Sequence, residues 1–269
     1  MRRFKLAPLF AVLLLAALGS GCNAFRELKA RDQLNKGVQS YRNGKFQEAI
    51  EHFKSSVQLD PSLVNARLYL ATAYAQQYVP GGDTPENVKT GQQAIGAFED
   101  VLRLDTKNTT ALASIGQIYY NMKNFDKAKD FQRQRMQVEP NNPEPYYWVG
   151  VIDWAQAFQN DGKIRKQLNL QVPNKLGNLP PLPEKYRGPL ADQNSQLIDE
   201  GIHALNKALN LKPNDVNSMA YLNLLYRQKA DIEKAPADRE ADLKTAESWL
   251  QKSMDIRKSQ PATPSTQGS

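Results

Sequence analysis

A spacing that recurs along the chain is the strongest constraint on its fold. Residues 109–142 place two small residues and a proline at intervals of twelve, at Gly116, Ala128 and Pro140. Apolar residues between them fit two helices joined by a short turn, with Asn124 in the turn. The small residues let the helices lie close together, and Pro140 ends the second helix because it cannot donate a helical hydrogen bond. One such hairpin cannot bury its own apolar face, so the pattern predicts stacked neighbours.

The same spacing predicts four more hairpins. Residues 30–63 repeat it without a gap. Residues 64–108, 143–215 and 216–260 keep the paired small positions but have extra residues between them. The expected pairs are Gly37 with Ala49, Ala71 with Ala94, Gly150 with Gly201, and Asn223 with Ala246. The sequence therefore predicts an all-α fold of about five helix hairpins, with insertions in the second, fourth and fifth.

This pattern resembles the tetratricopeptide repeat (TPR) family, whose 34-residue unit has small, aromatic and proline residues at these places. The resemblance covers about residues 30–260. It implies a right-handed helical solenoid whose concave face binds extended peptides or partner helices. Thr106 and Lys258 at the proline place and Asn223 at the glycine place depart from the family pattern. These departures weaken individual repeats without breaking the series.

Each insertion has a structure that its residues predict. In the second unit, Gly81 and Gly82 indicate a turn, Thr84 an N-cap and Pro85 the first residue of a helix. In the fourth unit, at about residues 155–193, two kinds of structure are expected. Asp161 is expected to cap a short helix through Leu170, and five prolines then exclude regular helix. The leucines of this stretch, Leu176, Leu179, Leu182 and Leu190, favour packing against the hairpins, although a disordered linker is an alternative.

The end of the chain is expected to close the series. Residues 241–258 predict a last helix, and residues 261–269 a disordered tail. The apolar face of this helix is predicted from Leu243, Ala246, Leu250 and Met254. Because its other faces are polar, the helix is able to cap the solenoid.

The start of the chain is typical of a secretory signal peptide over residues 1–21. Basic residues precede an apolar run, residues 6–18, that is short of the roughly 20 residues needed to cross a bilayer. Cys22 is the only cysteine and follows the small residues of the expected cleavage site. This resembles the bacterial lipoprotein signal, in which the cysteine becomes the N-terminus and is lipidated. Gly19 stands where that family usually has Leu, so an ordinary signal peptide is the alternative.

Lipidation implies a place in the cell envelope. The protein is expected to be exported and lipid-anchored, facing the periplasm, and Asn23 after the cysteine slightly favours the outer membrane. Residues 22–29 lead directly into the first repeat helix, which would hold the protein close to its membrane. The net charge of +7 includes Arg2, Arg3 and Lys5 of the signal peptide, and no long run of like charges predicts nucleic-acid binding.

Chemical motifs are sparse in this sequence. The two histidines, His52 and His203, lie some three units apart and have no neighbouring ligand at metal-binding spacing. No nucleophile or metal motif stands in a fitting context. The sequence therefore predicts a protein that is not an enzyme, with no catalytic residues, no cofactor, no metal and no small-molecule substrate.

The remaining prediction is a partner-binding surface. The TPR resemblance places certain residues of each first helix on the concave face. They are Leu34, Val38 and Tyr41; Leu68 and Thr72; Gln117, Tyr120 and Asn121; Tyr147, Val151 and Trp154; and Leu224 and Arg227. Packing of Tyr147 and Trp154 beneath the fourth insertion is an equal alternative. Leu34 and Val38 occupy places of the carboxylate clamp of some cytosolic relatives, which disfavours chaperone-tail binding.

Taken together, these features predict a protein–protein interaction adaptor of the bacterial cell envelope. Its partner would be another protein or a peptide segment, and its membrane contact would be the lipid. One alternative is a pilotin-like assembly factor for a secretion or pilus machine. Another is an accessory subunit of an envelope enzyme, and the fold alone does not decide among these roles.

Overall fold

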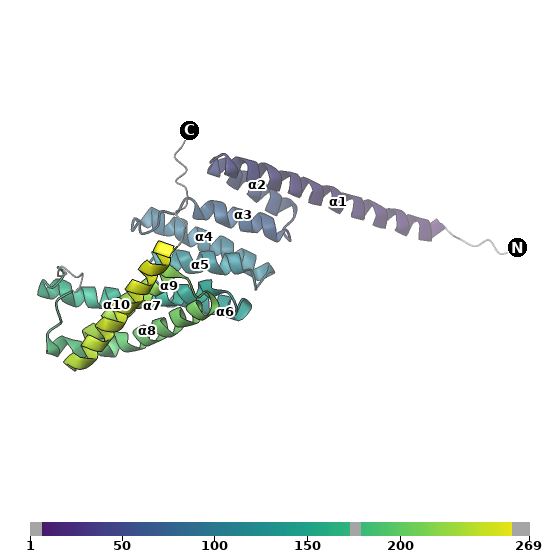
Figure 1. Ribbon diagram of the computed structural model, residues 1–269. Coiled ribbons are helices and arrows are strands. Elements are labelled where there is room, and N and C mark those ends of the chain that lie inside the picture. Colours follow the sequence, from purple (N-terminus) through teal and green to yellow (C-terminus); the bar gives the residue numbers. More distant parts are fainter. Residues whose placement is uncertain (1–6, 173–178, 260–269) are drawn as a thin grey trace, which may run out of the picture. The chain divides into compact units, whose positions relative to one another are not determined.

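The computed structural model describes residues 7–172 and 179–259, with side chains from Asn23 onward (Figure 1). Over these residues the chain forms ten α-helices and no strands, which confirms the predicted all-α class. The helices group into two compact units, Met1–Met122 and Lys123–Ser269.

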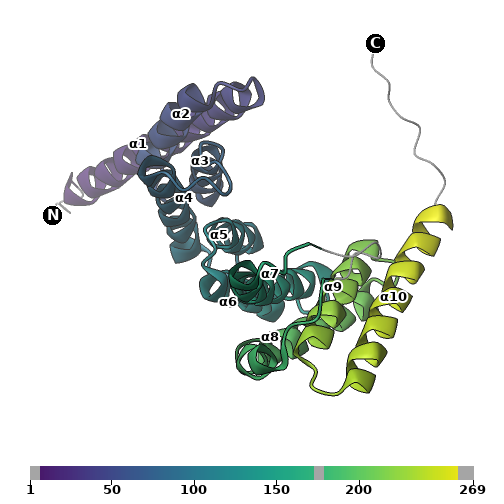
Figure 2. The same ribbon diagram turned by 90° about the vertical axis from the view of Figure 1, so that its left-hand side faces the viewer.

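The first unit is a series of helices in which each contacts the next (Figure 2). Its members are α1 (Ala7–Arg42), α2 (Phe46–Leu59), α3 (Val64–Ala75), α4 (Pro85–Leu104) and α5 (Thr109–Asn121). Helix α1 extends past α2 at its N-terminal end (Figure 1). It starts at Ala7 and runs across the expected signal-peptide boundary, so Cys22 lies within it. Among the described residues, no helix combines the length and the apolar character that a membrane span requires.

Close helix approach occurs where the small residues predicted it. A Cβ atom added to Gly37 of α1 would lie 2.5 Å from the ring of Phe53 of α2, and Phe53 is fully buried. Ala71 of α3 and Ala94 of α4 are likewise fully buried. The side chain of Ser56 donates a 2.7 Å hydrogen bond to the carbonyl of Ala30, which also joins α1 to α2. Small residues in this unit thus set the distance between neighbouring helices.

The insertion in the second repeat, residues 64–108, has the predicted structure. The backbone N–H of Asn87 donates a 3.3 Å hydrogen bond to the hydroxyl of the N-cap Thr84, and Pro85 is the first residue of α4. Gly81 has a φ of +77°, which suits glycine in a turn. The side chain of Asn87 bonds both backbone groups of Val79, at 2.8 Å each, and so holds this turn against the helix.

The second unit contains the five remaining helices of the described chain. They are α6 (Phe125–Val138), α7 (Pro143–Leu168), α8 (Glu184–Leu211), α9 (Val216–Ile232) and α10 (Pro236–Ser259). Helix α7 contacts α6, α8 and α9, and α10 lies along α9 (Figure 2). The core contains Leu205 of α8 and Met219, Leu222 and Leu225 of α9, together with Ile198. The N-cap of α6 is Asn124, and α6 ends just before Pro140, as predicted.

Two predicted pairs of small positions meet in this unit. A Cβ atom on Gly150 of α7 would lie 2.4 Å from Leu205 of α8, and one on Gly201 would lie 3.6 Å from the carbonyl oxygen of Gly150. The asparagine at the glycine place also has a role. The side-chain amide of Asn223 donates a 2.6 Å hydrogen bond to the carbonyl of Ala246 in α10. The departure from the repeat pattern therefore replaces close packing with a buried hydrogen bond.

An ion-pair network joins three helices of the second unit. The ammonium of Lys129 on α6 lies 2.6 Å from a carboxylate oxygen of Asp153 on α7 and 3.0 Å from one of Glu200 on α8. Arg133 adds a 2.6 Å contact to Glu200. Asp153 is fully buried, and burial raises its pKa to about 7 although Lys129 acts against this shift.

The predicted structure of the fourth insertion is wrong in two places. Helix α7 continues without a break to Leu168, so Asp161 lies inside it and is not an N-cap. Helix α8 begins at Glu184 and includes Pro189, where a loop was expected. Pro189 stands in the second turn of α8, so it removes only one helical hydrogen bond, while Leu190 and Ile198 are buried beyond it. Of the insertion leucines, Leu182 and Leu190 are buried as expected, Leu179 is half-buried, and Leu176 lies outside the described residues.

The last helix also differs from its prediction. It begins at Pro236, earlier than residue 241, and it buries Asp242, Ala246 and Ser253. Leu250 and Met254 are 39% and 37% exposed, so half of the predicted apolar face is wrong. Asp242, Ala246 and Ser253 mark the buried face of α10, and Leu250 and Met254 lie toward one edge of that face. The predicted tail, residues 261–269, lies outside the described residues.

Candidate functional site

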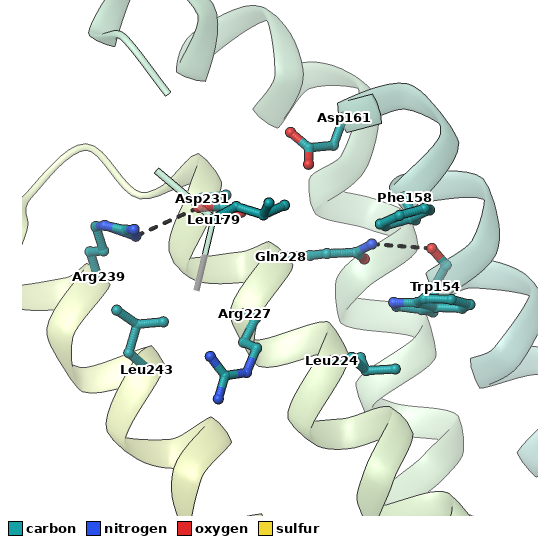
Figure 3. Close-up of a pocket in the computed structure, with 10 residues that line it drawn as sticks. All are labelled: Trp154, Phe158, Asp161, Leu179, Leu224, Arg227, Gln228, Asp231, Arg239 and Leu243. Carbon is teal, nitrogen blue, oxygen red and sulfur yellow. Dashed lines mark hydrogen bonds and ion pairs between the residues drawn. The ribbon is translucent and has the colours of Figure 1, made fainter. Parts of the chain in front are cut away.

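A pocket of about 170 Å³ lies in the second unit, between α7, α9, α10 and the segment that joins α7 to α8 (Figure 3). Helix α7 contributes Trp154, Phe158 and Asp161 to its lining; α9 contributes Leu224, Arg227, Gln228 and Asp231; α10 contributes Arg239 and Leu243; and Leu179 completes the wall. Half of the ten lining residues are apolar and half are charged or polar, so the pocket offers both kinds of contact to a ligand group.

The aromatic side of the pocket is built by the helical period of α7. Trp154 and Phe158 stand one turn apart and stack, with ring centroids 5.3 Å apart. Trp154 also meets the edge of Tyr221 on α9 at 5.3 Å. Phe158 is 49% exposed. One ring is therefore fixed by packing, and the other remains open to a ligand.

The opposite side is one face of α9. Leu224, Arg227, Gln228 and Asp231 follow one another at spacings of three, one and three, which places them on a single helical face. The side-chain amide of Gln228 donates a 3.3 Å hydrogen bond to the carbonyl of Trp154 and so joins α9 to α7 (Figure 3). Its Oε1 is buried and has no hydrogen-bond partner among the described residues. This face of α9 therefore gives the pocket a fixed wall, and it contains an acceptor, Gln228 Oε1, that has no partner among the described residues.

A buried charge cluster closes the deep end. Arg165, only 2% exposed, lies 2.6 Å from Asp161 and 2.8 Å from Asp231. Arg239 adds a longer contact of 3.6 Å to Asp231. Burial raises the pKa of Asp231 to about 6 and also raises the pKa of Asp161, while Arg165 acts in the opposite direction on both. Arg165 also donates a 2.7 Å hydrogen bond to the carbonyl of Pro180, which ties the wall segment to the cluster.

Arg227 differs from the other charged groups of the pocket. Its Nε donates a long, 3.4 Å hydrogen bond to Asn223. Its Nη1 is buried, and within residues 7–172 and 179–259 it has no hydrogen-bond partner. No ion pair joins it to a carboxylate in that part of the chain, and in Figure 3 its guanidinium lies between Leu224 and Leu243. The pocket therefore contains a cation that its own carboxylates do not neutralise.

The described lining residues of the pocket include no His, Cys, Ser or Lys. Among the described residues, no group of three His, Cys, Asp or Glu side chains is placed to hold a metal ion. His52 is part of the first unit, where its Nδ1 lies 2.9 Å from the side chain of Gln33. His203 is exposed on α8 and does not line the pocket. The arrangement suits recognition of an apolar group beside a charge.

Three of the residues predicted from the sequence meet in this pocket, namely Trp154, Leu224 and Arg227. Tyr147 does not line it, and its ring meets the edge of Tyr221 at 5.7 Å. Val151 is only 2% exposed, so we leave it out of the contact surface. Trp154 lines the same pocket as Leu179 of the insertion.

The predicted residues of the first unit are distributed over α1, α3 and α5. Leu34, Val38 and Tyr41 are half-buried against the cluster of α2 and α3 that contains Phe53. The hydroxyl of Thr72 donates to the carbonyl of Leu68 at 2.8 Å, and Gln117 donates to Asn121 at 3.3 Å. Tyr120 is half-buried on α5. All eight residues keep some exposed surface, and none lines the pocket.

Sequence reasoning missed several lining residues. Phe158, Gln228 and Asp231 follow predicted residues by one turn on the same helices, so the helical period was a signal for them. Arg239 and Leu243 were assigned to an insertion and to a core face. The earlier start of α10 at Pro236 makes Arg239 part of the helix, whereas Leu243 lies within the predicted helix and lines the pocket from there.

Comparisons with known proteins agree with the fold. Residues 109–142 match the model of the family described as Tetratricopeptide repeat. The structure is similar to that of MamA, from residue 41 to its end, from Desulfovibrio magneticus RS-1. The TM-score is 0.56 and the identity 19%, over 87% of this chain and 98% of that one. It is also similar to YrrB, described as a TPR protein with an unusual peptide-binding site, with a TM-score of 0.52 and 14% identity over 84% and 86% of the two chains. The fold is thus of the TPR type.

Similarity to curated proteins covers a smaller part of both chains. An Hsp70-Hsp90 organizing protein of Triticum aestivum is 27% identical over 115 residues, which are 43% of this chain and 18% of that protein. An interferon-induced protein with tetratricopeptide repeats 2 of Cricetulus griseus is 23% identical over 180 residues, 67% of this chain and 31% of that protein. The chain therefore spans less than a third of the length of these relatives.

Proposed function

We propose that this chain is a non-catalytic protein–protein interaction adaptor that binds a segment of its partner in the pocket of the second unit. The single observation that supports this most is Arg227, a half-buried side chain whose Nη1 is buried without a hydrogen-bond partner among the described residues and which lines the pocket beside Leu224 and Leu243. Such a group is costly to leave unsatisfied and is a usual anchor of interfaces. The similarity to YrrB, described as having a peptide-binding site, adds support.

Site-specific crosslinking tests this function. A photoreactive benzoylphenylalanine in place of Trp154 or Leu224 should form a covalent adduct with a partner in cells. The same residue in place of His203, which is exposed on α8 and outside the pocket, serves as the matched control. Adducts from His203 alone would contradict the proposal. A single stoichiometric pore or pilus subunit among the adducts would instead favour an assembly factor.

We also propose that the adaptor works in a bacterial cell envelope, anchored through lipid on Cys22. The order of basic, apolar and small residues before this lone cysteine supports the anchor. Two or more acyl chains would hold the protein firmly, since each buried methylene contributes about 0.8 kcal/mol. Cys22→Ala should move the protein from the membrane to the soluble fraction. Unchanged fractionation, with an unmodified N-terminus by mass spectrometry, would refute the anchor.

A further inference from the structure

We propose that the pocket recognises a partner segment in which a carboxylate stands next to one large apolar side chain. This inference rests on the proposed binding function and specifies the chemistry of the occupant. The carboxylate would meet Arg227, and the apolar group would lie between Phe158, Leu224 and Leu243.

The balance of charges around the pocket favours an acidic occupant. Asp161 and Asp231 both contact Arg165, and Asp231 has a second cation in Arg239. These two carboxylates and two guanidinium groups balance one another, which leaves the charge of Arg227 in excess. A basic segment would add a second unpaired cation beside it. An acidic segment would instead neutralise Arg227 and supply an acceptor for its buried Nη1.

The size and lining of the pocket favour a single apolar side chain. Its volume of about 170 Å³ is small, and five of its ten lining residues are apolar. Phe158 is 49% exposed beside it, so an occupant would cover a ring that the chain leaves open. Gln228 adds a buried acceptor, Oε1, without a partner among the described residues, which is suited to a backbone N–H of the segment. The pocket thus offers one site for an apolar group, one for an anion and one for a donor.

Part of the pocket wall comes from the insertion of the fourth repeat. Leu179 belongs to the insertion that interrupts the repeat pattern. The hydrogen bond of Arg165 to Pro180 and the burial of Leu182 hold this wall in place. Recognition therefore combines residues at repeat positions of α7 and α9 with residues of α10 and the insertion.

Selection from random peptides tests this chemistry without a known partner. Phage-displayed dodecapeptides are selected on the full chain, purified in detergent, and in parallel on its Arg227→Gln variant. The wild-type chain should enrich peptides with Asp or Glu within two residues of Leu, Met or Phe. Selection on Arg227→Gln should lose the acidic preference and keep the apolar one. Arg257→Gln on the exposed end of α10 makes the same charge change outside the pocket and should behave as wild type.

Isothermal titration calorimetry of one enriched peptide then measures the interaction free energy between its acidic residue and Arg227. Replacing its acidic residue by the amide should weaken binding by about tenfold or more, the scale of a hydrogen bond between charged groups. Arg227→Gln should weaken the parent peptide by a similar factor and remove the difference between the two peptides. Arg227→Lys keeps the positive charge but loses the planar, forked donors of the guanidinium. Its affinity for the parent peptide should therefore lie between those of the wild-type chain and Arg227→Gln. Circular dichroism shows that each variant is folded.

Several results would overturn the inference. They are enrichment of basic peptides, equal enrichment on both chains, or an acid-to-amide difference that survives Arg227→Gln. If deletion of residues 260–269 is needed before any peptide binds, the occupant is a segment of this chain and the proposed partner is wrong. If crosslinking at position 154 captures a partner but the selected peptides show no acidic preference, the adaptor function stands. Only the proposed contact between a carboxylate and Arg227 is then refuted.

Discussion

Single glycines decide how closely the helices of this protein approach. Gly150 and Gly162 both lie on α7, but only Gly150 faces another helix, because an added Cβ would overlap Leu205. Nothing lies within 4 Å of a Cβ placed on Gly162. The same residue type thus has a packing role at one position of the helix and none more than three turns away.

Gly150→Ala should therefore destabilise the second unit by about 1 to 3 kcal/mol, the usual cost of forcing extra volume into a packed core. Gly162→Ala should instead stabilise it by up to about 1 kcal/mol, because alanine favours a helix over glycine. Urea unfolding followed by tryptophan fluorescence measures both. Equal effects of the two substitutions would contradict the assigned contact.

Asn223 shows how a departure from a repeat pattern can be compensated. Its amide bonds the carbonyl of Ala246 at 2.6 Å, where a buried acceptor would otherwise face an apolar side chain. Asn223→Ala should lower the free energy of unfolding by about 1 to 3 kcal/mol, the cost of a lost buried hydrogen bond. Asn217→Ala on the exposed surface of α9 is the matched control and should change stability by less than about 0.5 kcal/mol.

At the scale of helices, the sequence correctly predicted the helix ends and close contacts that depend on nearby residue types. The N-cap Thr84, the close pair Gly150 and Gly201 and the end of α6 before Pro140 all follow from residue types at fixed offsets. The extent of α7 and α8 was missed, because burial of Arg165 and Leu190 by tertiary contacts outweighs the local effect of a proline. Trp154, Leu224 and Arg227 of the pocket came from the repeat pattern. Arg239 lies before the predicted helix start at residue 241, and Pro236 at the first position of α10 was a local signal for the earlier start that the prediction did not use.

The cluster around Arg165 joins α7, α9 and the inserted wall. Arg165→Met would leave Asp161 and Asp231 buried without this partner, so a loss of about 3 to 5 kcal/mol is expected. The matched control in the same unit is Lys212→Met, which removes the ion pair of an exposed ammonium with Asp215 and should cost less than about 1 kcal/mol. Urea unfolding compares the two, and a loss below about 1 kcal/mol for Arg165→Met would show that the cluster adds little.

At the scale of the whole molecule, pH should act on the stability of the second unit. Asp153 has an ordinary pKa of 3.8, and burial raises it to about 7, while the pKa of Asp231 rises to about 6. The folded state therefore binds these protons more tightly than the unfolded chain. The free energy of unfolding should fall as pH rises from about 4 to 7, by at most about 1.4 kcal/mol per pH unit for each group.

The tryptophans make this measurement specific. Trp148, Trp154 and Trp249 are the three tryptophans of the chain, and all belong to the second unit. Their fluorescence in urea at pH 5 and pH 8 follows that unit separately from the first. Asp153→Asn should flatten the pH dependence, since an amide does not titrate. A stability that rises between pH 5 and pH 8 would contradict the assigned shifts.

The hydrogen bond between Arg165 and Pro180 has a consequence for detecting the partner. The segment that joins α7 to α8 supplies Leu179 to the pocket, so a bound ligand would rest directly against it. A protease added at a fixed dose should then cut this segment more slowly as the pocket fills. The rate of cleavage would report the fraction of occupied molecules without a label on either protein.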